Sequence, residues 1–172
     1  NNIQSDNLNK IINRENFVDH ILQKIPEEWK DSDVILGERI KVNNWKLSKI
    51  IKYGKKKFFL NPSNFLKSNQ NIKLHFDIFH GDGLLDKAID LLEDSEKQDF
   101  RKFVIDNNSF NRENLFFCKS KTIMENYFQS IFKWLENCEN IFGFELEGYS
   151  KTRIYAFLAE RYLSFWFNKY SS

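Results

Sequence analysis

The last long apolar segment of the chain, KTRIYAFLAERYLSFWFNKY from Lys151 to Tyr170, constrains the fold most. A helix with this sequence would carry apolar side chains on nearly every side, and such helices are buried. We therefore predict one helix over Lys151–Tyr170 through the middle of a single domain, because 172 residues can enclose one core. The predicted core comprises Ile131, Trp134, Leu135, Ile154, Phe157, Leu158, Leu163, Phe165 and Trp166.

One stripe of this predicted helix mixes charged and aromatic residues. At a period of 3.6 residues it contains Arg153, Ala156, Phe157, Glu160, Leu163, Ser164 and Phe167. Two interpretations stay open: Glu160 and Arg161 pair at the edge of a buried helix, or they line a sugar or phosphate pocket. In both we expect Glu160 to be buried and paired with Arg153, Arg161 or a backbone donor.

Apolar residues at helical spacing predict further helices, and short apolar runs predict strands. The predicted helices cover Glu15–Ile25, Asn44–Tyr53 ending at Gly54, Leu84–Leu92, Ser95–Ile105 with a Ser95/Gln98 capping box, and Thr122–Asn140 capped by Ser120. The predicted strands or extended segments are Val34–Leu36, Phe58–Leu60, Leu74–Phe79 and Asn114–Cys118. These elements indicate a helix-rich α/β domain with a small sheet and a long C-terminal helix pair. We assign no structure to residues 1–13.

The loop His80-Gly81-Asp82-Gly83 is the most informative polar segment. Two glycines permit unusual backbone angles and the close approach of a ligand, while His80 and Asp82 can bond to hydroxyls or a phosphate. The alternative is a tight turn in which Asp82 caps the following helix.

Composition argues against several classes of protein. The net charge of +2 provides no global field for nucleic acid, and the lysine run Lys55–Lys57 is typical of a solvated turn, here a loop that enters a strand. Cys118 and Cys138 form neither a metal motif nor a disulfide framework, which fits reduced thiols in the cytoplasm. We expect a soluble chain, since no signal peptide is visible and no apolar run reaches about 18 residues.

Asp31-Ser32-Asp33 has the D-x-D spacing with which many glycosyltransferases hold a metal and a sugar diphosphate. In those enzymes the motif follows a buried strand, whereas here it precedes one. We therefore interpret it as a turn before the strand, and a divalent metal is not indicated.

Three segments resemble, in order and approximate spacing, a bacterial glycosyltransferase family that builds cell-surface polysaccharide, catalogued as domain-of-unknown-function family 4422. TRIYAFLAERYLSFWF is similar to the family's R-x-x-G-F-L-x-E-R-L-L, with Ala156 in place of Gly and Tyr162 in place of Leu. FFCKSKTIMENYFQSIFKWLENCE resembles N-M-F-I-M-K-K followed by Y-C-x-W-L-F-x-I-L-x-E-L-E, and FHGDGLLDKAIDLLE resembles H-x-x-x-D-L-x-x-A-I-x-I-I. The resemblance runs from about Asp33 to the C-terminus.

The resemblance implies transfer of a sugar, galactofuranose among the candidates, from a UDP-sugar to a glycan acceptor in capsule or O-antigen assembly. It also implies part of a GT-A-like domain in the bacterial cytoplasm, at the inner face of the membrane. The residues that it assigns to catalysis are Asp82 and Glu160, and those that it assigns to substrate binding are His80, Gly81, Gly83, Asn114, Arg153 and Arg161.

The family's N-terminal half, with its H-Y-R-R-Y-F motif, has no counterpart in this sequence. We therefore expect the chain to be the C-terminal part of a larger enzyme and to be inactive alone. The alternative is a non-catalytic helical interaction module of a capsule-synthesis protein.

Overall fold

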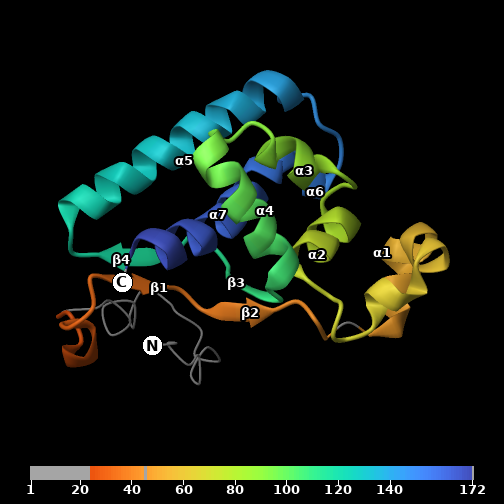
Figure 1. The fold of residues 1–172 in the computed structure, drawn as a ribbon, viewed down its shortest axis with the longest axis horizontal. Coiled ribbons are helices and arrows are strands. Elements are labelled where there is room, and N and C mark those ends of the chain that lie inside the picture. The colour runs from red at the N-terminus through yellow and green to blue at the C-terminus, as the bar shows by residue number, and fades with distance from the viewer. Residues whose placement is uncertain (1–23, 45, 172) are drawn as a thin grey trace, which may run out of the picture.

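The computed structural model describes residues 24–44 and 46–171. The elements in chain order are η2 (Glu27–Trp29), β1 (Val34–Leu36), β2 (Arg39–Lys41), α1 (Leu47–Leu60), η3 (Pro62–Phe65), α2 (Ile72–Phe79), α3 (Leu84–Ile89), α4 (Asp94–Asp106), β3 (Ser109–Asn111), β4 (Phe116–Cys118), α5 (Lys121–Phe142), α6 (Tyr149–Thr152) and α7 (Ile154–Tyr170). Figure 1 shows α7 crossing the middle of the molecule, α5 along one edge, the short strands along the opposite edge, and α1 at one end. The fold is helix-rich, as predicted.

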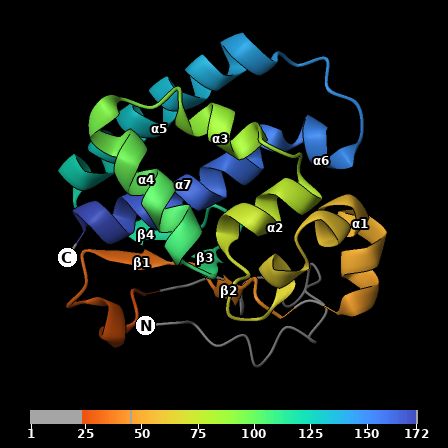
Figure 2. The same ribbon diagram turned by 45° about the vertical axis from the view of Figure 1, so that its right-hand side comes forward.

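Helix α7 is the buried centre of the domain. Every residue from Arg161 to Phe167 is buried, as the apolar sequence predicts. The helix packs against α5, α4 and β3, and Figure 2 shows it between α5 and the strands. The predicted single helix is interrupted once, because Arg153 has non-helical angles (φ −106°, ψ 16°) that separate α6 from α7.

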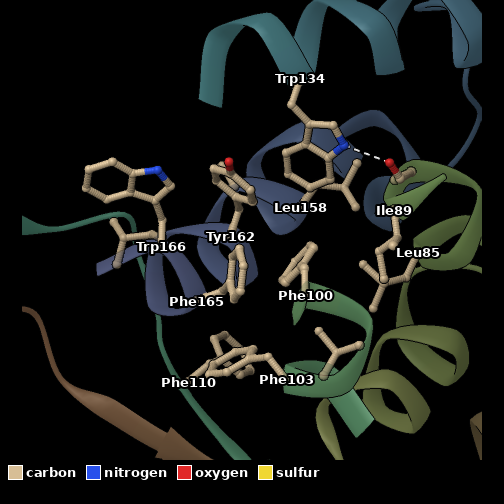
Figure 3. Close-up of a cluster of buried hydrophobic side chains, with 14 of the residues drawn as sticks. Leu85, Ile89, Phe100, Phe103, Phe110, Trp134, Leu158, Tyr162, Phe165 and Trp166 are labelled. Carbon is tan, nitrogen blue, oxygen red and sulfur yellow. Dashed lines mark hydrogen bonds between the residues drawn. The ribbon is translucent and has the colours of Figure 1, made fainter. Parts of the chain in front are cut away.

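Aromatic rings fill the core around Phe100 of α4 (Figure 3). Its ring meets the rings of Trp134 and Tyr162 edge to face, at centroid distances of 5.7 and 5.6 Å, and lies 4.9 Å from the ring of Phe165. The Trp134 indole N–H donates to the backbone oxygen of Ala88 at 2.7 Å, so the buried ring has no unpaired donor. The predicted core is confirmed, except that Leu135 and Phe157 are partly buried.

The strands form two small antiparallel ribbons. In one, β1 pairs with β4 with Ile35 opposite Phe117; in the other, β2 pairs with β3 with Ile40 opposite Phe110. The predicted strands at Val34–Leu36 and Asn114–Cys118 are confirmed, although the second begins at Phe116. Because β3 also contacts α7, the ribbons hold the loop between β3 and β4 beside the central helix.

The predicted end of the helix Asn44–Tyr53 at Gly54 is wrong. Helix α1 bends at Gly54 (φ −114°, ψ 15°) and continues to Leu60, so neither a strand at Phe58–Leu60 nor a lysine loop at Lys55–Lys57 forms. A Cβ at Gly54 would lie 3.3 Å from Ile78 and 3.4 Å from Phe65, so this glycine permits close packing and does not stop the helix.

The predicted extended segment at Leu74–Phe79 is also wrong, because it belongs to helix α2. Its alternating apolar residues face two separate clusters: Ile72 and Phe76 enter the main core, whereas Leu74 and Ile78 pack against the cluster of α1 and η3. A helix that is buried on two faces can therefore show the alternation of apolar and polar residues that is typical of a strand. The side chain of Asn71 caps α2 by accepting from the Leu74 N–H at 2.8 Å.

The remaining helices agree with the sequence apart from their ends. Ser120 caps α5 as predicted and accepts from the Ile123 N–H at 3.3 Å. The predicted capping box of Ser95 and Gln98 does not form, since α4 begins at Asp94 with Glu93 as its N-cap. Residues 15–23 of the predicted helix Glu15–Ile25 lie outside the described residues. No helix in the described ranges has the length and apolarity needed to span a membrane.

Candidate functional site

A buried arginine on α7 organises the most unusual polar group of the molecule. Arg161 is 1% exposed, and its Nη1 lies 2.7 Å from Glu160 Oε2 and donates to the Phe157 carbonyl at 3.0 Å. Its Nη2 lies 3.2 Å from His80 Nε2 and 3.3 Å from His75 Nδ1. The Arg161 cluster, defined here as Arg161, Glu160, His80 and His75, thus joins α7 to α2 and to the residue after α2.

The burial of this cluster determines its charges. Burial lowers the pKa of Arg161 to about 10, with Glu160 opposing the shift, so the guanidinium stays charged at neutral pH. Burial and the nearby Arg161 charge lower the pKa of His80 to about 3, and the same causes with His80 lower that of His75 well below 6.5. Both imidazoles are therefore neutral and accept from Arg161, which places the proton of His80 on Nδ1.

Aromatic rings surround the cluster. The guanidinium carbon of Arg161 lies 4.1 Å from the centroid of the Phe110 ring, and the His80 ring stacks on Phe157 at 3.9 Å. A cation over the face of a ring gains energy when both are shielded from water. The pair with Glu160 and these ring contacts compensate for the burial of a charge that would otherwise be costly.

Glu160 also fixes the loop between β3 and β4. Its Oε1 accepts from the Glu113 N–H at 3.1 Å, and Asn114 Nδ2 donates to the Ala156 carbonyl at 3.3 Å. Glu113 and Asn114 have positive φ angles of 72° and 51°, which are uncommon for residues other than glycine. Backbone strain of this kind persists where surrounding contacts hold it, and it concentrates at functional sites.

Three buried polar atoms around this region have no hydrogen-bond partner among the described residues: Arg161 Nε, His80 Nδ1 and Asn114 Oδ1. The first two can donate and the third can accept. Buried groups of this kind are rare in folded proteins, so they distinguish the Arg161 cluster from an ordinary paired charge in a core.

The glycine loop His80–Gly83 begins at this cluster and is fixed again at its other end. Asp77 Oδ1 accepts from the Gly83 N–H at 3.2 Å, and Gly81 and Gly83 have φ angles of 134° and 72°. Gly83 is the N-cap of α3, so the alternative in which Asp82 caps that helix is wrong. The Asp82 carboxylate instead lies 2.6 Å from Lys57 Nζ, with 71% of its side chain exposed.

Asp77 is the centre of a second charged group, the Asp77 network, defined as Asp77, Lys57, Lys73, Asp82 and Asp86. The Asp77 side chain is 4% exposed, and its Oδ2 lies 3.2 Å from Lys57 Nζ and 2.8 Å from Lys73 Nζ. Lys73 Nζ also lies 2.8 Å from Asp86. These pairs tie α1, α2 and α3 together beneath the glycine loop.

The structure brings some of the predicted site residues together and separates others. Glu160, Arg161 and His80 are in direct contact, and Asn114 is held against the same turn of α7. Asp82 pairs with Lys57, so the two predicted catalytic carboxylates belong to different hydrogen-bonded groups.

Arg153 is exposed and does not join the Arg161 cluster. Its guanidinium bonds to the Tyr149 hydroxyl and lies 5.4 Å from the Phe157 ring, which in turn stacks on His80.

His75 and Asp77 are the site residues that the sequence analysis missed. Both lie in the segment that the alternating pattern assigned to a strand. Lys73 and Asp77 are four residues apart, a spacing at which opposite charges pair on a helix, and this signal could have identified α2.

No group of three or more potential metal ligands occurs in the parts of the chain that the structure describes. Asp31 and Asp33 lie in an exposed turn before β1, as the interpretation of Asp31-Ser32-Asp33 predicts. Both cysteines are free, and burial raises the pKa of Cys138 to about 12, so its thiol stays protonated.

Comparison with known proteins gives one match. No curated protein and no solved structure shows significant similarity to the chain. A family described as a domain of unknown function (DUF4422) matches residues 11–171, beginning earlier than the resemblance that the motifs indicate from about Asp33. This match includes α7, the glycine loop and both strand ribbons, so the chain belongs to the DUF4422 family.

Proposed function

We propose that this domain is part of a glycosyltransferase of bacterial capsule or O-antigen biosynthesis that transfers a sugar from a UDP-sugar to a glycan acceptor. The motif resemblance supplies the reaction class. The observation that carries the proposal is the glycine loop, which His80 anchors at one end and Asp77 at the other while the Asp82 carboxylate stays exposed between them. A fixed loop that presents one accessible carboxylate suits a general base.

In this proposal Asp82 takes the proton of the acceptor hydroxyl while the hydroxyl oxygen attacks the anomeric carbon and the bond to UDP breaks. The present partner of Asp82 is Lys57, in an ion pair whose carboxylate side is 71% exposed. Such pairs contribute little energy, so an acceptor hydroxyl can compete for the carboxylate. Glu160 is a weaker candidate for proton transfer, because both of its oxygens already accept hydrogen bonds and its side chain is 15% exposed.

The other predicted residues take binding or positioning roles. Arg153 carries an exposed guanidinium that can contact the departing diphosphate, whereas Asn114, whose Oδ1 is buried and whose Nδ2 bonds to Ala156, would position the loop between β3 and β4. Arg161 is too buried for direct contact and would position His80, with Glu160 as its partner. A Cβ at Gly81 would lie 2.4 Å from Leu84, and one at Gly83 would point into open space, where a ligand can approach the backbone.

The same proposal includes the finer features implied by the resemblance. The nucleotide would be held mainly by the family's N-terminal half in a GT-A-like enzyme at the cytoplasmic face of the membrane, and galactofuranose is the candidate sugar. This chain alone should then transfer no sugar.

The test is the substitution Asp82→Asn in the parent enzyme, with transfer of radiolabelled sugar from a UDP donor as the readout. Loss of a general base should lower turnover by about 10²-fold or more, whereas the melting temperature should hardly change. Asp86→Asn is the matched control, because this carboxylate lies in the same network but outside the loop. Unchanged transfer in both Asp82→Asn and His80→Ala would remove the loop from the active site.

The second candidate function is a non-catalytic helical interaction module, and exposed apolar side chains favour it. Phe59 and Leu60 on α1 are 72% and 67% exposed, and Phe144 and Tyr149 near α6 are 73% and 70% exposed. Large exposed apolar residues that gather on a surface indicate contact with another protein part. Titration of the parent chain with a UDP-sugar, with and without the substitution Arg153→Met, separates the two functions, since a pure interaction module leaves the affinity of the parent chain unchanged.

A further inference from the structure

A hollow between α5 and the start of α4 lies apart from the Arg161 cluster. It has a volume of about 370 Å³, within the range of about 300 to 1,000 Å³ typical of small-molecule sites. Its lining includes Glu96 of α4, the amides Asn126, Gln129 and Asn137 of α5, Trp134 and Tyr170. Figure 1 shows the two helices that form its walls, with α7 behind them.

Amide side chains give the walls open hydrogen-bonding groups. Asn126 and Gln129 lie on exposed positions of α5, and their amides make no hydrogen bond to the described residues. Asn137 donates to the Leu91 carbonyl at 3.5 Å through Nδ2, which leaves its oxygen as an acceptor. Each free amide offers two donors and a carbonyl acceptor, the mixed pattern that a sugar hydroxyl requires.

The floor of the hollow contains a fixed carboxylate. Glu96 is 9% exposed, and its Oε2 accepts from the Tyr162 hydroxyl at 2.5 Å, while Ser130 also bonds to that hydroxyl. Oε1 of Glu96 has no hydrogen-bond partner in the part of the chain that the structure describes, so it remains an acceptor. Tyr162 therefore fixes the Glu96 carboxylate through Oε2 and leaves Oε1 able to accept a further hydrogen bond.

The charge of the hollow indicates which ligand fits. Lys133 pairs with Glu93, so the remaining charged side chain, Glu96, leaves the lining with a net negative charge. A phosphate or nucleotide would be repelled, whereas a neutral polyhydroxyl ligand can donate to the carboxylate. Tyr170 is 44% exposed at the rim and presents an aromatic surface for the apolar face of a sugar ring.

We propose that this hollow is a binding site for a neutral saccharide. Two neighbouring residues of α7 serve the two regions. Tyr162 bonds to Glu96 in the floor of the hollow, whereas Arg161 faces α2 and bonds to His80. The site would hold a glycan chain at a distance from the glycine loop. This inference does not depend on the proposed transfer reaction, because binding can be measured without a donor.

The experiment titrates the isotopically labelled chain with methyl β-D-galactofuranoside, methyl β-D-galactopyranoside, methyl α-D-glucopyranoside and lactose, and follows NMR signals. We expect the side-chain amides of Asn126 and Gln129 and the indole N–H of Trp134 to shift with at least one probe at concentrations up to about 50 mM, a range suited to millimolar affinity. UMP is the contrasting probe and should leave these signals in place. Absence of a shift with all four saccharides, or a shift with UMP alone, would overturn the proposal.

Two variants test whether the lining carries the binding. The double substitution Asn126→Ala and Gln129→Ala should weaken the affinity about tenfold without unfolding, because neither side chain bonds to the described residues. Glu96→Gln keeps an acceptor for Tyr162 and should weaken binding several-fold by removing the charge. Gln98→Ala removes an exposed amide of α4 outside the hollow and should have no effect. Equal affinity in the double variant and this control would contradict the assignment.

Discussion

The two charged groups that hold the glycine loop differ in their burial. The cation of the Arg161 cluster is a guanidinium that is 1% exposed and bonds to His80, whereas in the Asp77 network the buried Asp77 carboxylate holds Gly83 and the cation that pairs with Asp82 is Lys57, whose side chain is 29% exposed. A buried charge is costly to leave unpaired, whereas water screens an exposed pair. We infer that the first group determines whether the domain folds, and that the second leaves Asp82 free to react.

Removal of the buried cation should give the largest effect. Arg161→Met keeps an unbranched side chain of similar length but removes the guanidinium that bonds to Glu160, His80 and His75. We expect a loss of about 3 to 5 kcal/mol in the free energy of unfolding, measured with urea. Arg153→Met is the control, because Arg153 is exposed and should lose at most about 0.5 kcal/mol. Similar losses in both variants would show that the buried Arg161 contributes no more to stability than an exposed arginine does.

Acid should lower the stability that the Arg161 cluster provides, because His80 belongs to it. Folding lowers the pKa of His80 from 6.5 to about 3, so the unfolded chain binds a proton first as the pH falls. The stability that comes from the neutral ring is therefore present above pH 6.5 and is lost toward pH 3, by about 2 to 3 kcal/mol between pH 7 and pH 4. The titratable groups that face His80 are Arg161 and His75. Arg161 stays charged between pH 7 and pH 4, and the pKa of His75 is lowered as well, so neither reverses the loss of stability in acid.

The variant His80→Gln isolates this contribution. Its amide oxygen can still accept from Arg161, but it does not titrate. The free energy of unfolding of the variant should fall less between pH 7 and pH 4 than that of the unmodified chain. Parallel curves for the two proteins would show that His80 does not titrate differently in the folded and unfolded states.

The Asp77 network should give an intermediate effect at its buried centre. Asp77→Asn keeps an oxygen that can accept from the Gly83 N–H but removes the charge that pairs with Lys57 and Lys73. We expect a loss of about 1.5 to 3 kcal/mol in urea unfolding, the range for hydrogen bonds to charged groups. A loss near zero would mean that the two lysines find other partners.

The smallest effect on stability should come from the exposed member of that network. Asp82→Asn breaks a pair with Lys57 in which the carboxylate is mostly in water. The free energy of unfolding should fall by less than about 1 kcal/mol. A larger loss, in thermal or urea unfolding, would give Asp82 a structural role in the loop.

Much of the fold could be predicted because α7 and α5 each carry a single clear pattern. Apolar residues on all sides of α7 indicate a buried helix, and one apolar face with a Ser120 cap indicates α5. The second half of α1 and the whole of α2 were predicted incorrectly, and for α2 the reason is tertiary. Ile72 and Phe76 face one cluster and Leu74 the other, so the period of α2 depends on neighbours that the local sequence does not reveal.

The candidate site was predictable only in part for the same reason. Glu160 pairs with Arg161 and with a backbone N–H, as expected, although its side chain is 15% exposed and thus only partly buried. His75 and Asp77 could not be identified while their segment was assigned to a strand, and only the contact between α2 and α7 brings His75 to Arg161. The role of Asp82 in transfer stays a prediction.

The most direct test of this account is the pKa of His80 by NMR, followed through its ring signals between pH 8 and pH 4. If the Arg161 cluster holds the loop as a fixed unit, His80 should stay neutral throughout, with its proton on Nδ1, because its pKa is lowered to about 3. Titration near pH 6.5, the ordinary value, would show that the ring reaches water and is not bound to Arg161. The buried anchor of the glycine loop would then not exist.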